Sequence, residues 1–215
     1  MIVAVDGPAG SGKGTLTKLV ADKLNLQYID TGAMYRCIAL KMLEEGIGLE
    51  DTDKIKEILD GIEIDLQGPK VILNGRDVSK EIRTVEVANF TSPVSTIDFV
   101  RTKMVELQRG LGKEKDIIME GRDIGTVVFP NADVKIYLDA SAEERAKRRV
   151  KQNEENGIAS NYEQILKDII ERDTRDMSRP NSPLKKAEDA VVVDTTDAEC
   201  EVNAQKIIDV IKSKI

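Results

Sequence analysis

A glycine-rich segment near the N-terminus has the residue types and the spacing of a loop that binds phosphate groups. It reads GPAGSGKGT and lies between a short apolar run and a helical pattern. Small residues let successive backbone N–H groups turn toward one anion, and the N-terminus of the following helix adds partial positive charge. Lys13 supplies a mobile cation for the β- and γ-phosphates of a nucleoside triphosphate. We therefore predict that ATP or GTP binds to Gly7, Gly10, Ser11, Gly12, Lys13, Gly14 and Thr15.

The loop departs from the general motif at Gly14, where most such loops carry a Ser or Thr whose hydroxyl binds Mg²⁺. The hydroxyl comes one residue later, at Thr15, which is about 100° further around a helix. We therefore expect ATP oxygens and water to hold Mg²⁺, and we assign no residue as its ligand, although a direct contact from Thr15 stays open. The competing interpretation is a glycine-rich turn that binds nothing, but it leaves the strand, loop and helix context unexplained.

A second pattern places arginines where they could bind an acceptor phosphate. The segment ERDTRDMSRP has Arg172, Arg175 and Arg179 at helical spacing, with Asp176 one turn beyond Arg172. Pro180 should end this helix. Planar guanidinium groups suit the paired oxygens of a phosphate better than lysine does. The competing interpretation is a solvated helix face with interspersed acidic residues.

The apolar pattern predicts a parallel sheet that positions these residues. Short apolar runs alternate with helical patterns, of which the clearest is 33–45, and the runs lie at 2–5, 27–29, 117–119, 134–138 and 190–193. Strands interleaved with helices imply a parallel sheet. The predicted fold class is therefore α/β, with a five-stranded parallel sheet flanked by helices.

Two stretches fall outside this sheet. Short alternating runs between about 62 and 83, closed by Asn74-Gly75, predict antiparallel hairpins in an insertion. The charged segment 143–160 predicts two helices joined by an exposed tip, which we interpret as a candidate lid. We predict one domain with a core of 1–34, 115–142 and 165–215, an insert of about 35–114 and a lid of about 143–164.

Composition argues against several protein classes. The net charge of −7 over 215 residues disfavours a protein that grips long DNA or RNA. There is no histidine, and Cys37 and Cys200 lie in no paired motif, so we expect neither a disulfide framework nor a zinc site. We find no secretory leader and no apolar run near the roughly 20 residues of a membrane span. We expect a cytoplasmic monomer with no nucleic-acid polymer and no membrane as partner.

Five motifs, in this order, resemble those of the bacterial cytidylate kinases: GPAGSGKGT, IDTGAMYR, TSPVSTIDFVR, MEGRDIGTVVFP and ERDTRDMSRP. Several nucleoside monophosphate kinases share the GKGT ending, whereas GRDIGTVVFP together with the RDxRDxxR spacing is more distinctive. The resemblance covers nearly the whole chain. It implies a P-loop kinase that phosphorylates CMP and dCMP with ATP and Mg²⁺ in pyrimidine nucleotide metabolism. It also implies that the hairpin insertion enlarges a monophosphate-binding region.

The resemblance also implies a set of acceptor-binding residues. Thr31 stands where the family often has serine, a change that keeps the hydroxyl donor. Arg172 and Asp176 would reach the sugar and Arg179 the phosphate, while Lys13, Arg122 and Arg179 would stabilise charge on the transferred group. The full implied acceptor set is Thr31, Arg36, Ser92, Arg101, Arg122, Asp123, Arg172, Asp176 and Arg179.

The hydrogen-bonding edge of cytosine gives a physical reason for part of this set. The edge offers two acceptors and one amino donor, so Ser92 and Arg101 as donors and Asp123 as acceptor would match it. Uracil reverses part of this pattern, and a buried group left unpaired would cost several kcal/mol, which disfavours UMP. The competing interpretation for Asp123 and Glu120 is that each caps a helix after the strand.

Three alternatives stay open at this point. Another small kinase, of the uridylate, adenylate or shikimate type, would share the phosphate loop, because a fold does not fix a function. A binding module that hydrolyses or senses ATP would act on a protein partner instead. Arg145, Arg148 and Arg149 are candidates to close over ATP, with an exposed, ion-paired helix face as the competing interpretation.

Overall fold

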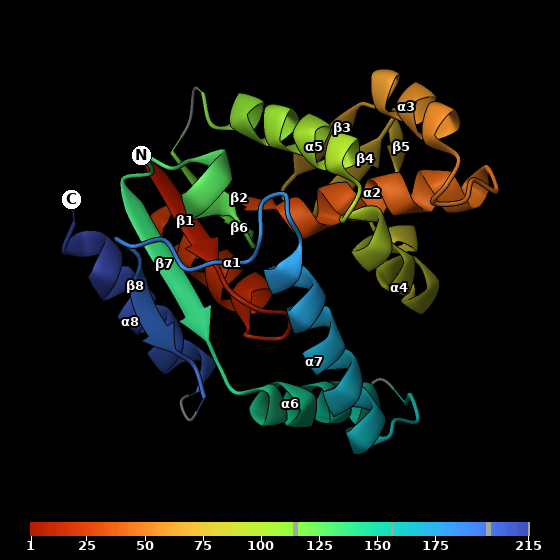
Figure 1. The fold of residues 1–215 in the computed structure, drawn as a ribbon. Coiled ribbons are helices and arrows are strands. Elements are labelled where there is room, and N and C mark those ends of the chain that lie inside the picture. Colours follow the sequence, from red (N-terminus) through yellow and green to blue (C-terminus); the bar gives the residue numbers. More distant parts are fainter. Residues whose placement is uncertain (114–115, 156, 197–198, 215) are drawn as a thin grey trace. The chain divides into compact units, whose positions relative to one another are not determined.

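The structure, a computed structural model, describes residues 1–113, 116–155, 157–196 and 199–214. The chain forms two compact units, one of Met1–Tyr28 with Lys115–Ile215 and one of Ile29–Glu114 (Figure 1). Each unit has its own cluster of buried apolar side chains. The insert predicted at about 35–114 lies inside the second unit.

The first unit is organised by the predicted five-stranded parallel sheet, which is confirmed, in the order β2-β6-β1-β7-β8. The strands are β1 (Ile2–Asp6), β2 (Gln27–Asp30), β6 (Ile117–Gly121), β7 (Val134–Asp139) and β8 (Val191–Asp194). All five residues of β6 are buried, as expected for a parallel strand covered on both faces. In the β1–β6 register, Val5 pairs with Glu120 and Asp6 with Gly121. The loops that follow β1 and β6 therefore begin at the same edge of the sheet.

The helices of this unit are α1 (Lys13–Leu24), α6 (Ala142–Glu155), α7 (Tyr162–Ser178) and α8 (Cys200–Lys212), with a π-helical turn η2 at Ile124–Val128. Apolar residues of α1 and α8 form one buried cluster with residues of β1, β6, β7 and β8. Burial of each large apolar side chain there stabilises the fold by about 1.5–3 kcal/mol relative to exposure. Helices α6 and α7 pack against each other.

Two predictions about this helical region are wrong. The segment 143–160 holds one helix, α6, and the next helix begins at Tyr162, where the Asn161 side chain accepts a hydrogen bond from the Gln164 amide. Arg179 does not share the helix with Arg172, because α7 ends at Ser178 and Arg179 has an extended backbone with ψ of 138°. Proline disfavours the helical conformation in the residue before it, and Pro180 follows Arg179.

The second unit contains the small antiparallel sheet that the alternating runs predict. Its strands are β3 (Ile64–Gln67), β4 (Lys70–Leu73) and β5 (Arg76–Asp77). Between β4 and β5, Asn74 and Gly75 have φ values of 47° and 80°, so both adopt the positive φ that a two-residue hairpin turn requires.

Helices of the second unit enclose its apolar cluster, which includes Met34, Tyr35 and Leu40. They are α2 (Thr31–Glu44), α3 (Thr52–Asp60), α4 (Val85–Val94) and α5 (Asp98–Leu111), with a 3-10 turn η1 at Glu81–Arg83. Cys37 and Cys200 are both free thiols, the first buried and the second exposed. Within the described residues, no helix combines the length and the apolar character needed to cross a membrane.

Candidate functional site

The phosphate loop has the backbone conformation that its glycines predict. Gly12 adopts a φ of +85° immediately before Lys13, the first residue of α1. Gly7 adopts a φ of +152°, and a Cβ placed on it would lie 2.2 Å from the Leu138 carbonyl oxygen of β7. Any other residue at position 7 would therefore force the main chain of the loop or of β7 to move.

Lys13 lies over its own loop. Its side chain is 6% exposed, and its Nζ donates hydrogen bonds to the Pro8 carbonyl at 2.7 Å and to Ser11 Oγ at 3.4 Å. Burial and the nearby charge of Arg122 lower the pKa of Lys13 well below its usual range, while Glu120 opposes this shift. A phosphate beside this amino group would favour its charged form.

Glu120 lies close to the loop at Gly14. A Cβ on Gly14 would lie 3.3 Å from Glu120 Oε1 and 3.8 Å from the Tyr28 hydroxyl, which itself donates a hydrogen bond to Glu120. Glu120 is buried at the carboxyl end of β6. The sequence interpretation considered Glu120 only as a helix cap. Its position at the end of a buried strand was the signal for a role beside the phosphate loop.

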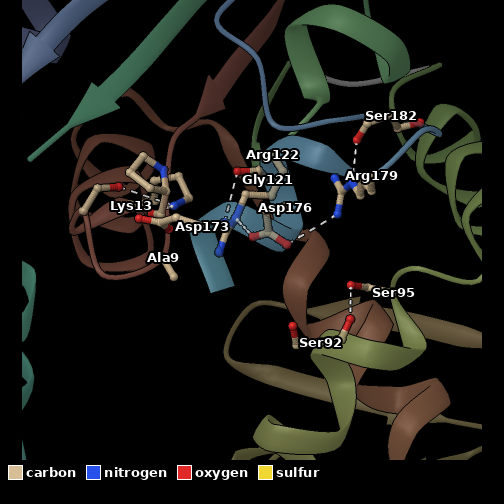
Figure 2. A network of polar contacts seen from close by, with 12 residues as sticks. Ala9, Lys13, Ser92, Ser95, Gly121, Arg122, Asp173, Asp176, Arg179 and Ser182 are labelled. Carbon is tan, nitrogen blue, oxygen red and sulfur yellow. Dashed lines mark hydrogen bonds and ion pairs between the residues drawn. The ribbon is translucent and has the colours of Figure 1, made fainter. Parts of the chain in front are cut away.

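Asp176 joins two of the predicted arginines (Figure 2). Arg122 Nε donates to Asp176 Oδ2 at 3.0 Å, and Arg179 Nη1 lies 3.6 Å from Asp176 Oδ1. Arg179 Nε also donates to the Ser182 carbonyl at 2.7 Å. Burial raises the pKa of Asp176, but the charges of Arg122, Arg172 and Arg179 outweigh burial and leave that pKa below its ordinary value.

Arg172 lies close enough to Lys13 and Asp176 for its charge to act on both. This charge lowers the pKa of each. The first unit thus gathers five predicted site residues: Lys13, Arg122, Arg172, Asp176 and Arg179. Four of these are cationic side chains and one is a carboxylate, and three arginines that act on one carboxylate are groups that can bind the oxygens of an anionic ligand.

Asp123 and Asp6 lie at the start of η2. Asp123 occupies the N-cap position of this turn but makes no capping hydrogen bond with its side chain, which disfavours the competing interpretation of Asp123 as a cap. Asp6 accepts hydrogen bonds from the amides of Ile124 and Gly125, both at 2.8 Å. Burial raises the pKa of Asp6 to about 6. The sequence interpretation treated Asp6 only as the end of a strand and missed that it fixes the loop after Arg122 and Asp123.

In the second unit, Asp30 holds Arg36 and starts α2. Its Oδ1 accepts from the Ala33 amide at 3.0 Å, and its Oδ2 accepts from Arg36 Nη2 at 2.7 Å. Thr31 is buried as the first residue of α2, which begins two residues before the predicted start because Asp30 caps it.

Arg101 is the most deeply buried arginine of the predicted set, at 2% exposed. Its Nη1 donates to the Ser95 carbonyl at 3.2 Å, and its guanidinium group lies 5.3 Å from the centre of the Tyr35 ring. Ser95 Oγ in turn donates to the carbonyl of Ser92, a buried residue of α4 (Figure 2). Burial of a charged group is costly, so an arginine kept at this buried position is a candidate for recognition.

The predicted acceptor residues therefore form two groups, one within each unit. Thr31, Arg36, Ser92 and Arg101 belong to the second unit, and Arg122, Asp123, Arg172, Asp176 and Arg179 belong to the first.

The three candidate arginines of α6 differ in environment. Arg145 is buried, Arg148 donates hydrogen bonds to the carbonyls of Thr195 and Thr196, and Arg149 is exposed with a bond to Gln152 at 3.1 Å. Arg149 fits the competing interpretation of a solvated helix face, and Arg148 fits it in part, because its Nε also lies 3.5 Å from Glu144 Oε1 on the same helix.

Comparison with known proteins assigns the chain to a family. A family model described as cytidylate kinase matches residues 3–213. A relative named cytidylate kinase from Fusobacterium nucleatum subsp. nucleatum is 49% identical over 100% of this chain and 97% of its own length. Another so named, from Bacillus subtilis, is 46% identical over 99% and 96%. The structure of a shikimate kinase from Bacteroides thetaiotaomicron has a TM-score of 0.51 at 12% identity, with 99% and 98% of the two chains covered, and so shows a shared fold alone. The chain belongs to the cytidylate kinase family.

Proposed function

We propose that this protein transfers the γ-phosphoryl group of ATP to CMP and dCMP, giving CDP and dCDP, in pyrimidine nucleotide metabolism. The observation that carries the proposal is the cluster in which Lys13 of the phosphate loop shares an electrostatic neighbourhood with Arg122 and Arg172, with Asp176 bound to Arg122. Membership of the cytidylate kinase family supplies the class of acceptor.

The donor half uses the loop and α1. The backbone N–H groups of Gly10, Ser11 and Gly12 would bind the phosphates of ATP, and Lys13 would neutralise charge on the β- and γ-phosphates. Transfer then requires positioning and charge stabilisation rather than a covalent intermediate, because phosphoryl transfer passes through a loose transition state.

Mg²⁺ would accompany ATP, and the oxygen ligands near Gly14 suit it. Mg²⁺ prefers carboxylate, hydroxyl and water oxygens and keeps several of its waters. Glu120 presents a carboxylate beside Gly14, and Thr15 follows with an exposed hydroxyl. We propose that these two residues hold the ion through its water shell while ATP oxygens bind it directly. When bound, the ion neutralises charge on the β- and γ-phosphates.

The acceptor half uses both groups of predicted residues. In the first unit, Arg122 and Arg179 would bind the acceptor phosphate, and Arg172 and Asp176 the sugar. Asp176 would also hold the two guanidinium groups in fixed orientations, so that the attacking oxygen is kept in line with the γ-phosphorus. The insert 35–114 would be the monophosphate-binding region and 143–164 the lid.

Base recognition would rest on Arg101, Ser92 and Asp123. The bond to the Ser95 carbonyl and the stacking on Tyr35 fix the Arg101 guanidinium group, which leaves its orientation little freedom. A fixed donor discriminates well, because a base with the wrong hydrogen-bond pattern leaves it unpaired. Thr31 and Arg36 would add contacts to the acceptor phosphate.

We further propose that the protein works in the cytoplasm as a monomer on free nucleotides. The net charge of −7 supports free nucleotides as the ligands, since a protein that binds polynucleotides or acidic membrane surfaces usually carries excess positive charge. Light scattering of the purified protein at several concentrations would test the monomer.

An assay of ADP release across acceptors tests the function. CMP and dCMP should give the fastest turnover, UMP a slower one, and AMP and shikimate only the rate seen without acceptor. A different leading acceptor would indicate another small kinase. ATP hydrolysis that no acceptor stimulates would instead indicate a module that senses or hydrolyses ATP.

Variants test base recognition within the same assay. Arg101→Met, or Asp123→Asn if the first does not fold, should lower kcat/KM for CMP by about tenfold or more, because a buried hydrogen bond to the base is lost. The KM for ATP should stay nearly unchanged. Arg109→Met on the exposed side of α5 is the matched control. An equal loss of ATP affinity would show that Arg101 does not read the base.

A further inference from the structure

The buried guanidinium group of Arg145 in α6 joins three segments of the first unit. Its Nε donates to the Ala140 carbonyl at 2.9 Å, its Nη1 to the Ala9 carbonyl at 2.8 Å and its Nη2 to Asp173 Oδ2 at 2.5 Å. The side chain is 5% exposed. A guanidinium group in this environment is held by bonds of fixed direction, because its donors are rigid and planar.

The bond to Ala9 sets a peptide of the phosphate loop. In a trans peptide the C=O and the N–H point in opposite directions, and the described part of the chain contains no cis peptide. The Gly10 N–H therefore points away from Arg145. A Cβ on Gly10 would lie 3.3 Å from Arg145 Cβ, so the loop also packs directly on this side chain. Arg145 thus fixes the direction of one amide in the loop proposed to bind ATP.

The bond to Asp173 reaches the helix that carries acceptor residues. Asp173 follows Arg172 directly in α7 and precedes Asp176 by one helical turn. It is itself buried and ion-paired with Arg145. Figure 2 shows Asp173 on the same helix as Asp176. A movement of Arg145 would therefore move both the phosphate loop and α7.

We propose that Arg145 and Asp173 are positioning residues that keep the donor loop and the acceptor helix in register without contacting either nucleotide. The proposal deepens the function proposed above and rests on it. Three bonds and an exposure of 5% leave little of the Arg145 side chain open to ATP, and a reorientation toward ATP that broke the bond to Asp173 would leave a buried carboxylate without this partner, which is costly.

Two conservative variants test this. Arg145→Lys keeps the charge but cannot bond Ala9 and Asp173 in one rigid plane, and Asp173→Asn keeps the shape but removes the charge. Each should lower kcat for CMP phosphorylation by about 10- to 100-fold while the KM for ATP and for CMP changes by less than about threefold, because misplacement of bound reactants acts on the chemical step. Lys147→Gln in α6 and Asp168→Asn in α7, both exposed, are the controls.

The double variant and a second measurement separate the possible outcomes. If the two residues act as one unit, the double variant should be no slower than the slower single variant by more than about twofold. Hydrogen exchange of the Gly10–Gly12 amides should also rise in Asp173→Asn, although position 173 lies in α7. A rise of more than tenfold in the KM for ATP with unchanged kcat would overturn the proposal in favour of direct ATP binding. An unchanged kcat with only a lower melting temperature would reduce the pair to a structural role. Failure of the wild-type enzyme to use CMP would refute the proposed function instead.

Discussion

At the scale of single residues, buried carboxylates organise the cationic groups of the first unit. Asp176 accepts a hydrogen bond from Arg122 and forms an ion pair with Arg179. Asp173 forms an ion pair with Arg145. The charges of Arg122, Arg172 and Arg179 outweigh burial and keep the pKa of Asp176 below its ordinary value, so its charged form is stabilised in the folded protein. Arg122 and Arg179 are then held in fixed orientations in which they could bind a phosphate, whereas Arg145 is held by the loop and α7.

Asp6 gives a pH-dependent prediction at this scale. Burial raises its pKa from 3.8 to about 6, although the amides of Ile124 and Gly125 partly oppose the shift. The folded state thus holds the proton more tightly than the unfolded state, so the stabilisation is fully present below about pH 4 and is lost as pH rises to about 6. The free energy of unfolding that Asp6 contributes through this shift is up to about 3 kcal/mol.

Urea unfolding of wild type and Asp6→Asn between pH 4 and pH 7 tests this. The free energy of unfolding of the wild type should fall relative to that of Asp6→Asn as pH rises to about 6, and the difference should then stay constant. If the free energies of unfolding of the two proteins differed by a constant amount from pH 4 to pH 7, Asp6 would not titrate in this range. The groups that act most strongly on Asp6 besides the two amides are Asp123 and Lys13, so Asp123→Asn is the informative second variant.

Lys13 and the loop glycines could be predicted from sequence, because a phosphate loop is a local pattern. Glu120 and Asp6 could not, since their roles depend on the β1–β6 register, which brings residues far apart in the chain to one sheet edge. Arg145 was a candidate for ATP contact, but its bonds to Ala9 and Asp173 depend on the packing of α6 and on tertiary geometry that spacing does not encode.

At the scale of elements, the turn from β1 into the loop depends on Gly7. Gly7→Ala should destabilise the first unit by about 2 kcal/mol or more, because its Cβ would meet the backbone carbonyl of Leu138 at 2.2 Å. Gly157→Ala is the control, since Gly157 has a φ of +69° but no atom within 4 Å of the added Cβ, so only about 1 kcal/mol of backbone strain is expected. If both variants lost the same free energy of unfolding in urea, the backbone of β7 would be able to move away from the added Cβ at little cost.

Periodicity predicted the strands well and the helix ends less well. The five strands of the parallel sheet are short apolar runs bounded by turns, and the Asn74-Gly75 turn carries its own conformational signal. The end of α7 was placed too late because the helical spacing of the arginines was given more weight than Pro180. Helix α6 contains Asn153, because a single Asn in a helix interior costs only a few tenths of a kcal/mol.

At the scale of the whole molecule, the chain comprises two units with separate apolar cores and a proposed lid at 143–164. Because water could accept the phosphoryl group, we predict that the lid closes only when donor and acceptor are both bound. Hydrogen exchange in α6 and in 157–164 should slow with a bisubstrate analogue and change little with ATP or CMP alone. Unchanged exchange with the analogue would contradict closure.

Phosphorus NMR of the purified protein with ATP, Mg²⁺ and CMP follows the phosphoryl transfer itself. We expect ADP and CDP to appear in equal amounts, with no inorganic phosphate beyond the background without enzyme, and Lys13→Met to abolish both signals. Inorganic phosphate without CDP, or CDP formed equally well by Lys13→Met, would contradict a phosphoryl transfer from the Lys13 loop to a cytidine monophosphate.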